Sequence, residues 1–262
     1  MESCARGSGA SVRRSATVGG VRDAALVLLF LTLMAALPAR AEEVANLADA
    51  REAVVLLHGL YRSKRAMRPL AARLEAAGYA VHNLGYPSIT AAPDELSSLL
   101  REKVEGCCAG APRLHFVTHS LGGILTRALL AEQAPANLGR VVMLAPPNHG
   151  SEFVDVFGNA FGWALGPTGR ELGTAPSSLP NRLPPPDYAF GVIAGTWSLN
   201  PLSAFVLPGD SDGTVSVEST RLDGMSDFVA VPASHTFILY SDDAAKQVLE
   251  FLRTGRFKES GT

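Results

Sequence analysis

The chain has 262 residues, a formal net charge of −2, and 47% hydrophobic residues. This length and apolar content allow one α/β domain or two small ones with a sizeable buried core. The slightly acidic balance, without a long basic run, gives no reason to expect nucleic acid as a partner.

The N-terminal segment is typical of a signal peptide. Several arginines precede an apolar run from Ala24 to Leu37, and Pro38–Ala41 then offers the small residues of a cleavage site. The run is too short to span a bilayer comfortably. We therefore predict a signal peptide over residues 1–41 and a secreted or periplasmic domain over 42–262. An uncleaved N-terminal membrane anchor is the alternative.

Short apolar runs then alternate with amphipathic stretches. The runs predict strands at 53–57, 79–84, 113–118, 140–145, 190–194 and 228–231. The amphipathic stretches predict helices at 66–77, 123–133 and 243–251, with another opening at 92–95. Continuous apolar runs are typical of parallel strands buried on both faces. The alternation therefore predicts an α/β fold with a mostly parallel central sheet and helices on both faces.

The alternation fails between residues 151 and 186. Aromatic side chains crowd the beginning of this segment, from Phe153 to Trp163, and Gly and Pro dominate the rest. We interpret it as a lid-like or cap-like insertion whose aromatic part forms an apolar acyl pocket. An ordinary capping helix followed by a proline-rich loop is the alternative.

One turn of the chain carries the pattern of a nucleophile elbow. An apolar strand runs into Ser120, Gly122 and Gly123 follow, and a helical stretch begins at Ile124. A strand, a sharp turn with serine at its tip and a helix place the hydroxyl above the sheet. The usual G-x-S-x-G pattern has a small residue two positions before the serine, where this chain has Thr118. A buried strand with a glycine-rich turn is the alternative.

A serine hydroxyl needs a base to take its proton and a carboxylate to orient that base. Two loops after Ser120 supply these groups in the order that this chemistry takes on α/β sheets. The first loop contains Asp210 and Asp212, of which we favour Asp212 because Asp-x-x-Val leads back into apolar structure. The second loop contains His235, between the last strand and the last helix. The base is therefore predicted to be His235.

Backbone amides complete the predicted site. An oxyanion hole needs two N–H donors, which we assign to Leu121, directly after the serine, and to Leu60, in the turn after the first strand. We expect His58 to orient that turn, and His119 to pack beside the serine or to line the pocket. This chemistry requires no cofactor and no metal.

The mature part has two cysteines, Cys107 and Cys108. They form neither a disulfide framework nor a zinc-binding spacing. Two half-buried thiols or a vicinal disulfide in a surface loop are the two interpretations.

Several motifs together resemble the α/β-hydrolase superfamily, and bacterial lipases and esterases in particular. These motifs are His58-Gly59, Thr118–Gly123, Asp212–Val215 and Ser234-His235. The segments Tyr86–Ser88 and Leu144–Ser151 also resemble the GPI-inositol-deacylase-like branch. The resemblance covers residues 53–252.

The resemblance implies a serine hydrolase that cleaves carboxylic esters through an acyl-enzyme. We expect a small-molecule or lipid ester as the substrate. Any contact with a membrane surface is expected to be transient. An acyltransferase on the same fold and a non-catalytic binding protein are the alternatives.

Overall fold

The computed structural model describes residues 51–201 and 203–258, apart from the side chains of residues 159–161. In this part of the chain six strands form one parallel sheet in the order β2-β1-β3-β4-β5-β6. The strands are β1 (Ala53–Leu57), β2 (Ala80–Leu84), β3 (Leu114–His119), β4 (Leu138–Leu144), β5 (Phe190–Gly195) and β6 (Asp227–Val231). The predicted α/β architecture is confirmed, and each strand lies within about two residues of its predicted bounds. The predicted signal peptide lies outside the described residues.

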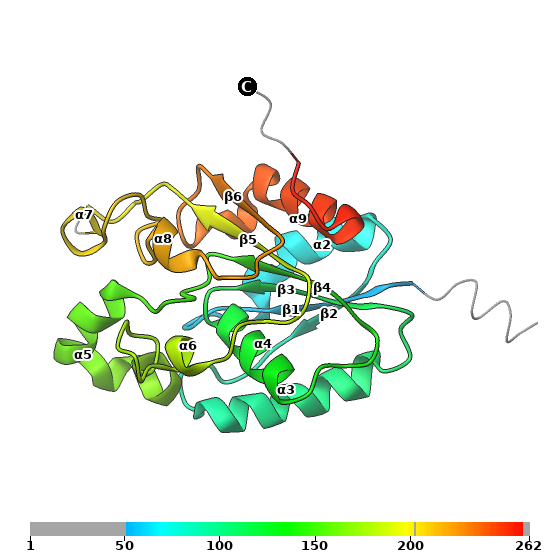
Figure 1. Cartoon of the computed structure of the whole chain (residues 1–262), viewed down its shortest axis with the longest axis horizontal. Helices are drawn as coiled ribbons and strands as arrows, with labels where there is room; N and C mark the ends of the chain where they lie inside the picture. Colours follow the sequence, from blue (N-terminus) through cyan, green and yellow to red (C-terminus); the bar gives the residue numbers. More distant parts are fainter. Residues whose placement is uncertain (1–50, 202, 259–262) are drawn as a thin grey trace, which may run out of the picture. The chain divides into compact units, whose positions relative to one another are not determined.

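Helices cover both faces of the sheet (Figure 1). The four that pack on it are α2 (Arg68–Ala76), α3 (Pro93–Cys108), α4 (Leu121–Glu132) and α9 (Asp242–Thr254). Successive strand residues point to opposite faces, so Val55 joins the core cluster with α3 and α4, and Val54 joins the cluster with α2 and α9. Burial on both faces is why the strands are continuous apolar runs.

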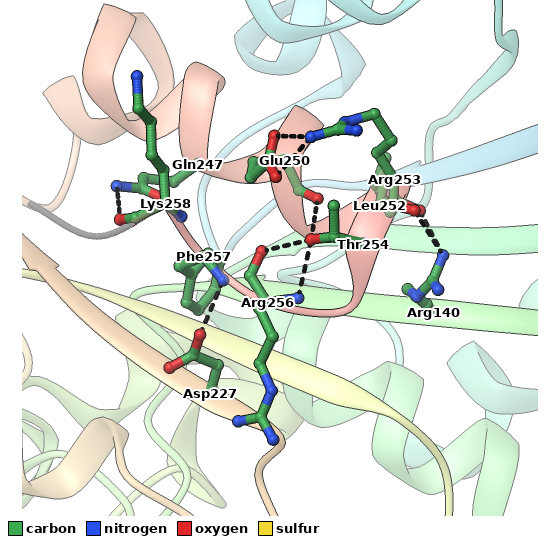
Figure 2. A network of polar contacts seen from close by, with 10 residues as sticks. All are labelled: Arg140, Asp227, Gln247, Glu250, Leu252, Arg253, Thr254, Arg256, Phe257 and Lys258. Atoms are coloured by element: carbon green, nitrogen blue, oxygen red, sulfur yellow. Dashed lines mark hydrogen bonds and ion pairs between the residues drawn. The ribbon is translucent and has the colours of Figure 1, made fainter.

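Helix α9 has clear start and stop signals. The Ser241 hydroxyl accepts a hydrogen bond from the amide of Ala244, and Gly255 ends the helix at a φ of 82°. Figure 2 shows contacts around the end of α9: Arg140 of β4 donates to the carbonyl of Leu252, and the Phe257 amide donates to the Asp227 carboxylate. These contacts fix the element that follows the predicted histidine loop.

The remaining elements are short, except in the insertion. They are η1 (Lys64–Met67), α5 (Glu152–Arg170), α6 (Leu179–Arg182), α7 (Ser203–Val206), α8 (Val217–Thr220) and η2 (Phe237–Tyr240). Helix α5 continues to Arg170, although Gly166 has a φ of 69° and Pro167 follows it. The glycine- and proline-rich part of the insertion is thus more helical than its composition suggests. In the described part of the chain, no helix combines the length and apolarity needed to cross a membrane.

Candidate active site

Ser120 stands at the turn between β3 and α4 with a backbone φ of 53° and ψ of −125°. A positive φ is strained for a residue other than glycine, and here it turns the chain abruptly from strand to helix. The Ser120 amide is held by the carbonyl of Leu144, 2.9 Å away. A Cβ atom on Gly122 would lie 2.5 Å from the carbonyl oxygen of Leu57. Only glycine fits there without a shift, so the elbow and β1 are packed backbone against backbone.

Three predicted residues from distant parts of the chain meet at this turn. His235 Nε2 lies 3.0 Å from Ser120 Oγ, and His235 Nδ1 lies 2.6 Å from Asp212 Oδ2. These partners require a hydrogen on Nδ1, donated to the carboxylate, and a lone pair on Nε2, facing the serine hydroxyl. The arrangement has the geometry by which a histidine can take a proton from serine.

The two aspartates of the acidic loop have different surroundings. Asp212 is buried, and its Oδ1 accepts hydrogen bonds from the amides of Thr214 at 2.9 Å and Val215 at 2.8 Å. Asp210 is exposed, and its backbone carbonyl accepts from Val217. The Asp-x-x-Val turn therefore wraps amides around one oxygen of Asp212 and leaves the other for His235.

The turn after β1 lies against the nucleophile. A Cβ on Gly59 would be 3.0 Å from the Ser120 Cβ. His58 Nδ1 donates to the carbonyl of Gly59 at 3.0 Å, so His58 does orient this turn, as predicted. Burial lowers the pKa of His58, and in the neutral ring that this favours Nε2 can accept from the Tyr86 amide at 3.5 Å.

Two amides near the serine are free to bind an oxyanion. Leu121 is the first residue of α4, so its N–H has no partner within the helix. Within the described residues, no backbone acceptor bonds the amide of Leu60 or of Leu121. In the described part of the chain, the two amides predicted as oxyanion donors are thus left without a backbone acceptor.

His119 has a more specific contact than sequence reasoning suggested. It is 1% exposed, and its Nε2 donates to the backbone carbonyl of His235 at 2.8 Å. Burial first, and the neighbouring His235 second, hold the pKa of His119 well below its usual value. The Nδ1 atom is buried without a hydrogen-bond partner in the described part of the chain. His119 thus supports the loop that carries His235.

Tyr86 is another residue whose role was not predicted. Its ring stacks on that of His58, with ring centroids 4.1 Å apart, and its hydroxyl donates to the carbonyl of His58. The only sequence signal was its place in the Tyr86–Ser88 motif. The stacking fixes the ring that orients the Gly59 turn.

A cavity of about 190 Å³ opens beside Ser120 and His235. Its apolar walls come largely from the turn after β1 and from the insertion, and they consist of Leu60, Pro147, Phe153, Val154, Leu165, Leu172 and Val215. Phe153 stacks on Phe157, whereas Trp163 is 78% exposed and does not line the cavity. A larger hollow of about 410 Å³ lies around Arg101 and Pro135, away from the serine.

The two cysteines are joined to each other in a disulfide at the end of α3, rather than in a surface loop. With His82 they form the one group of three or more possible metal ligands within 4.8 Å of one another in the described residues. Because both sulfur atoms are engaged in the disulfide, the group offers no thiolate in this state.

The fold and the serine elbow define a protein of the hydrolase class built on a parallel α/β sheet. The alpha/beta hydrolase family matches residues 54–256, well over half of the chain. The chain belongs to the alpha/beta hydrolase family.

Solved structures share the fold at low sequence identity. The mature lipase BlEst2 of Bacillus licheniformis is 20% identical, with a TM-score of 0.59 over 79% of this chain and 92% of that one. The lin2722 gene product of Listeria innocua is 17% identical, with a TM-score of 0.55 over 81% of this chain and 97% of that one.

A third similar structure belongs to a larger protein. Phospholipase PlaB of Legionella pneumophila is 21% identical, with a TM-score of 0.53 over 65% of this chain. The match covers 44% of PlaB, less than half of its length. No curated protein matches the chain in sequence. At these identities the structural likeness extends to the fold alone.

Proposed function

We propose that this protein is a serine hydrolase that cleaves carboxylic esters. The observation that carries the proposal is the continuous chain of contacts from Ser120 through His235 to Asp212, at 3.0 and 2.6 Å. Membership of the alpha/beta hydrolase family and the fold shared with a lipase support it.

The reaction follows from the donors and acceptors at the site. Ser120 Oγ attacks the ester carbonyl while His235 Nε2 takes its proton, and Asp212 stabilises the resulting imidazolium. The amides of Leu60 and Leu121 bind the carbonyl oxygen as it becomes an anion. His235 returns the proton to the departing alcohol, and water then cleaves the acyl-enzyme to give the carboxylic acid.

We also propose that the insertion, residues 151–186, acts as a cap over the bound acyl group. The support is that Phe153, Val154, Leu165 and Leu172 come from it and line the cavity. We also propose, from the N-terminal sequence, that the chain is exported with residues 1–41 as its signal peptide. The likeness to GPI-inositol-deacylases and a transient contact with a membrane surface are likewise proposals from the sequence.

A fluorophosphonate probe tests the nucleophile. The folded wild-type protein should be labelled, whereas Ser120→Ala should not, and Ser177→Ala, an exposed serine in a loop, should behave as wild type. An unlabelled wild-type protein would show that Ser120 is not an activated serine.

The two aspartates supply a matched pair for the orienting carboxylate. Asp212→Asn should lower kcat on a p-nitrophenyl ester by up to about 10⁴-fold, the loss known for the corresponding change in a well-studied serine protease. Asp210→Asn should leave kcat unchanged, because Asp210 is exposed and, among the described residues, it forms a hydrogen bond only through its backbone carbonyl. Equal losses in both variants would refute the assignment of Asp212.

A further inference from the structure

The segment directly after the Gly59 turn, residues 60–68, contains several cationic residues and no acidic residue. Four exposed cations lie within it: Arg62, Lys64, Arg65 and Arg68. From Ala53 to Leu74 there is no acidic residue. Within the described residues none of the four cations is in an ion pair. This cationic segment belongs to a chain whose net charge is −2, so its charge is local rather than general.

One of these cations reaches the candidate active site. Arg62 lines the same cavity as Ser120 and His235. Its Nη2 donates to the Thr236 hydroxyl at 2.7 Å, which holds the guanidinium beside the histidine loop. No other side-chain hydrogen bond of Arg62 occurs among the described residues, so the remaining guanidinium N–H groups are available.

The lining of the cavity combines apolar side chains with one permanently charged side chain, Arg62. The insertion supplies apolar walls, and among the described residues that line the cavity none is acidic. An acyl chain fits against the apolar walls, where burial of its methylene groups is favourable. Arg62 is exposed whereas Ser120 is buried, so Arg62 lies toward the solvent side of this site. Guanidinium groups bind phosphate and carboxylate in a bidentate manner.

We propose that Arg62 selects esters whose alcohol part carries an anionic group, a phosphate monoester or a carboxylate. The inference rests on the proposed ester hydrolysis at Ser120 and specifies its substrate class. Lys64, Arg65 and Arg68 do not line the cavity. Arg62 is the residue that contacts the anion.

The test compares two esters that differ only in the phosphate group, 1-octanoylglycerol 3-phosphate and 1-octanoylglycerol, at concentrations where both are monomeric. For the wild-type protein we expect kcat/KM to be about 5- to 10-fold higher for the phosphate. Arg62→Gln should bring this ratio close to one, and Arg62→Lys should keep part of it. Raising the salt from about 50 to about 500 mM should lower the wild-type ratio.

Arg68→Gln is the matched control. It removes the same charge from the same segment at an exposed position that does not line the cavity, so the ratio should stay near the wild-type value. Equal ratios for the two esters in the wild-type protein, or equal effects of Arg62→Gln and Arg68→Gln, would overturn the proposal. If the neutral ester is still cleaved in that case, ester hydrolysis stands and only the anion preference fails. If neither ester is cleaved and Ser120 is not labelled, both proposals fall.

Discussion

Replacement of His119 by phenylalanine tests how strongly the site depends on the loop that carries His235. Phenylalanine keeps an aromatic ring in the buried position but removes the N–H that donates to the His235 carbonyl. No other donor in the described residues bonds that carbonyl. A Cβ on Gly59 would lie 2.9 Å from His119 Nδ1, so the ring is also confined by the turn that carries Leu60.

The expected magnitude follows from the cost of an unmade hydrogen bond. A buried acceptor without a donor costs about 1–3 kcal/mol. If the loop relieves this cost by moving His235 away from Ser120, the same free energy appears in the activation barrier, as a loss in kcat of about 5- to 150-fold. KM should change little, because the change affects proton transfer more than the apolar walls.

The assay is steady-state hydrolysis of a p-nitrophenyl ester, with urea unfolding measured in parallel. His119→Gln should retain more activity than His119→Phe, because its side-chain amide can still donate. His82→Phe is the control, a half-buried histidine on the edge strand β2 with no side-chain hydrogen bond among the described residues. Wild-type kcat in His119→Phe, with only the free energy of unfolding reduced, would refute a positioning role.

Two further predictions concern stability. Gly122→Ala should lower the free energy of unfolding, measured in urea, by about 1–3 kcal/mol, because the new Cβ meets the Leu57 carbonyl oxygen. Gly106→Ala in α3 is the control, since its Cβ enters open space and should raise the free energy of unfolding by up to about 1 kcal/mol. Similar values for the two variants would contradict this packing. Burial lowers the pKa values of His58, His115 and His119, so the folded state binds these protons less readily than the unfolded chain does. The free energy of unfolding should therefore be highest above a pH of about 6.5 and should fall as the pH drops below it, by at most about 1.4 kcal/mol per histidine and pH unit. Urea unfolding between about pH 8 and 5 measures this. A constant free energy of unfolding over that range would refute it.

The sequence predicted the strands well because each one is short, apolar and bounded by polar or small residues. The residues brought together at the serine were also predictable, since each follows a strand and parallel strands end at one edge of the sheet. The choice of Asp212 over Asp210 relied on a local feature, the turn back to Val215, and that turn supplies the two amides at its carboxylate.

Contacts between distant segments were not predictable in the same way. His119 and His235 are separated by 116 positions, and nothing in either local sequence indicates that one donates to the other's carbonyl.

The full length of helix α5 was not predictable from the sequence for a different reason. Its glycines and Pro167 lower helix propensity, but packing of Val154 and Leu172 against the core favours order in this region. Propensity alone therefore favoured a loop over the end of this helix.

Thr118 shows how a departure from the usual elbow pattern is accommodated. The position is fully buried, and the small residue usual there allows strand and helix to pass closely. The Thr118 hydroxyl donates to the Val142 carbonyl of β4 at 3.5 Å, so its polar group is paired within the sheet. On the helix side, a Cβ on Gly123 would lie 3.4 Å from Thr118 Oγ1, an ordinary contact, and 3.2 Å from the Pro146 Cβ, a tight one. The threonine is thus accommodated by a bond to the neighbouring strand, and Pro146 rather than Thr118 is the neighbour that favours glycine at position 123.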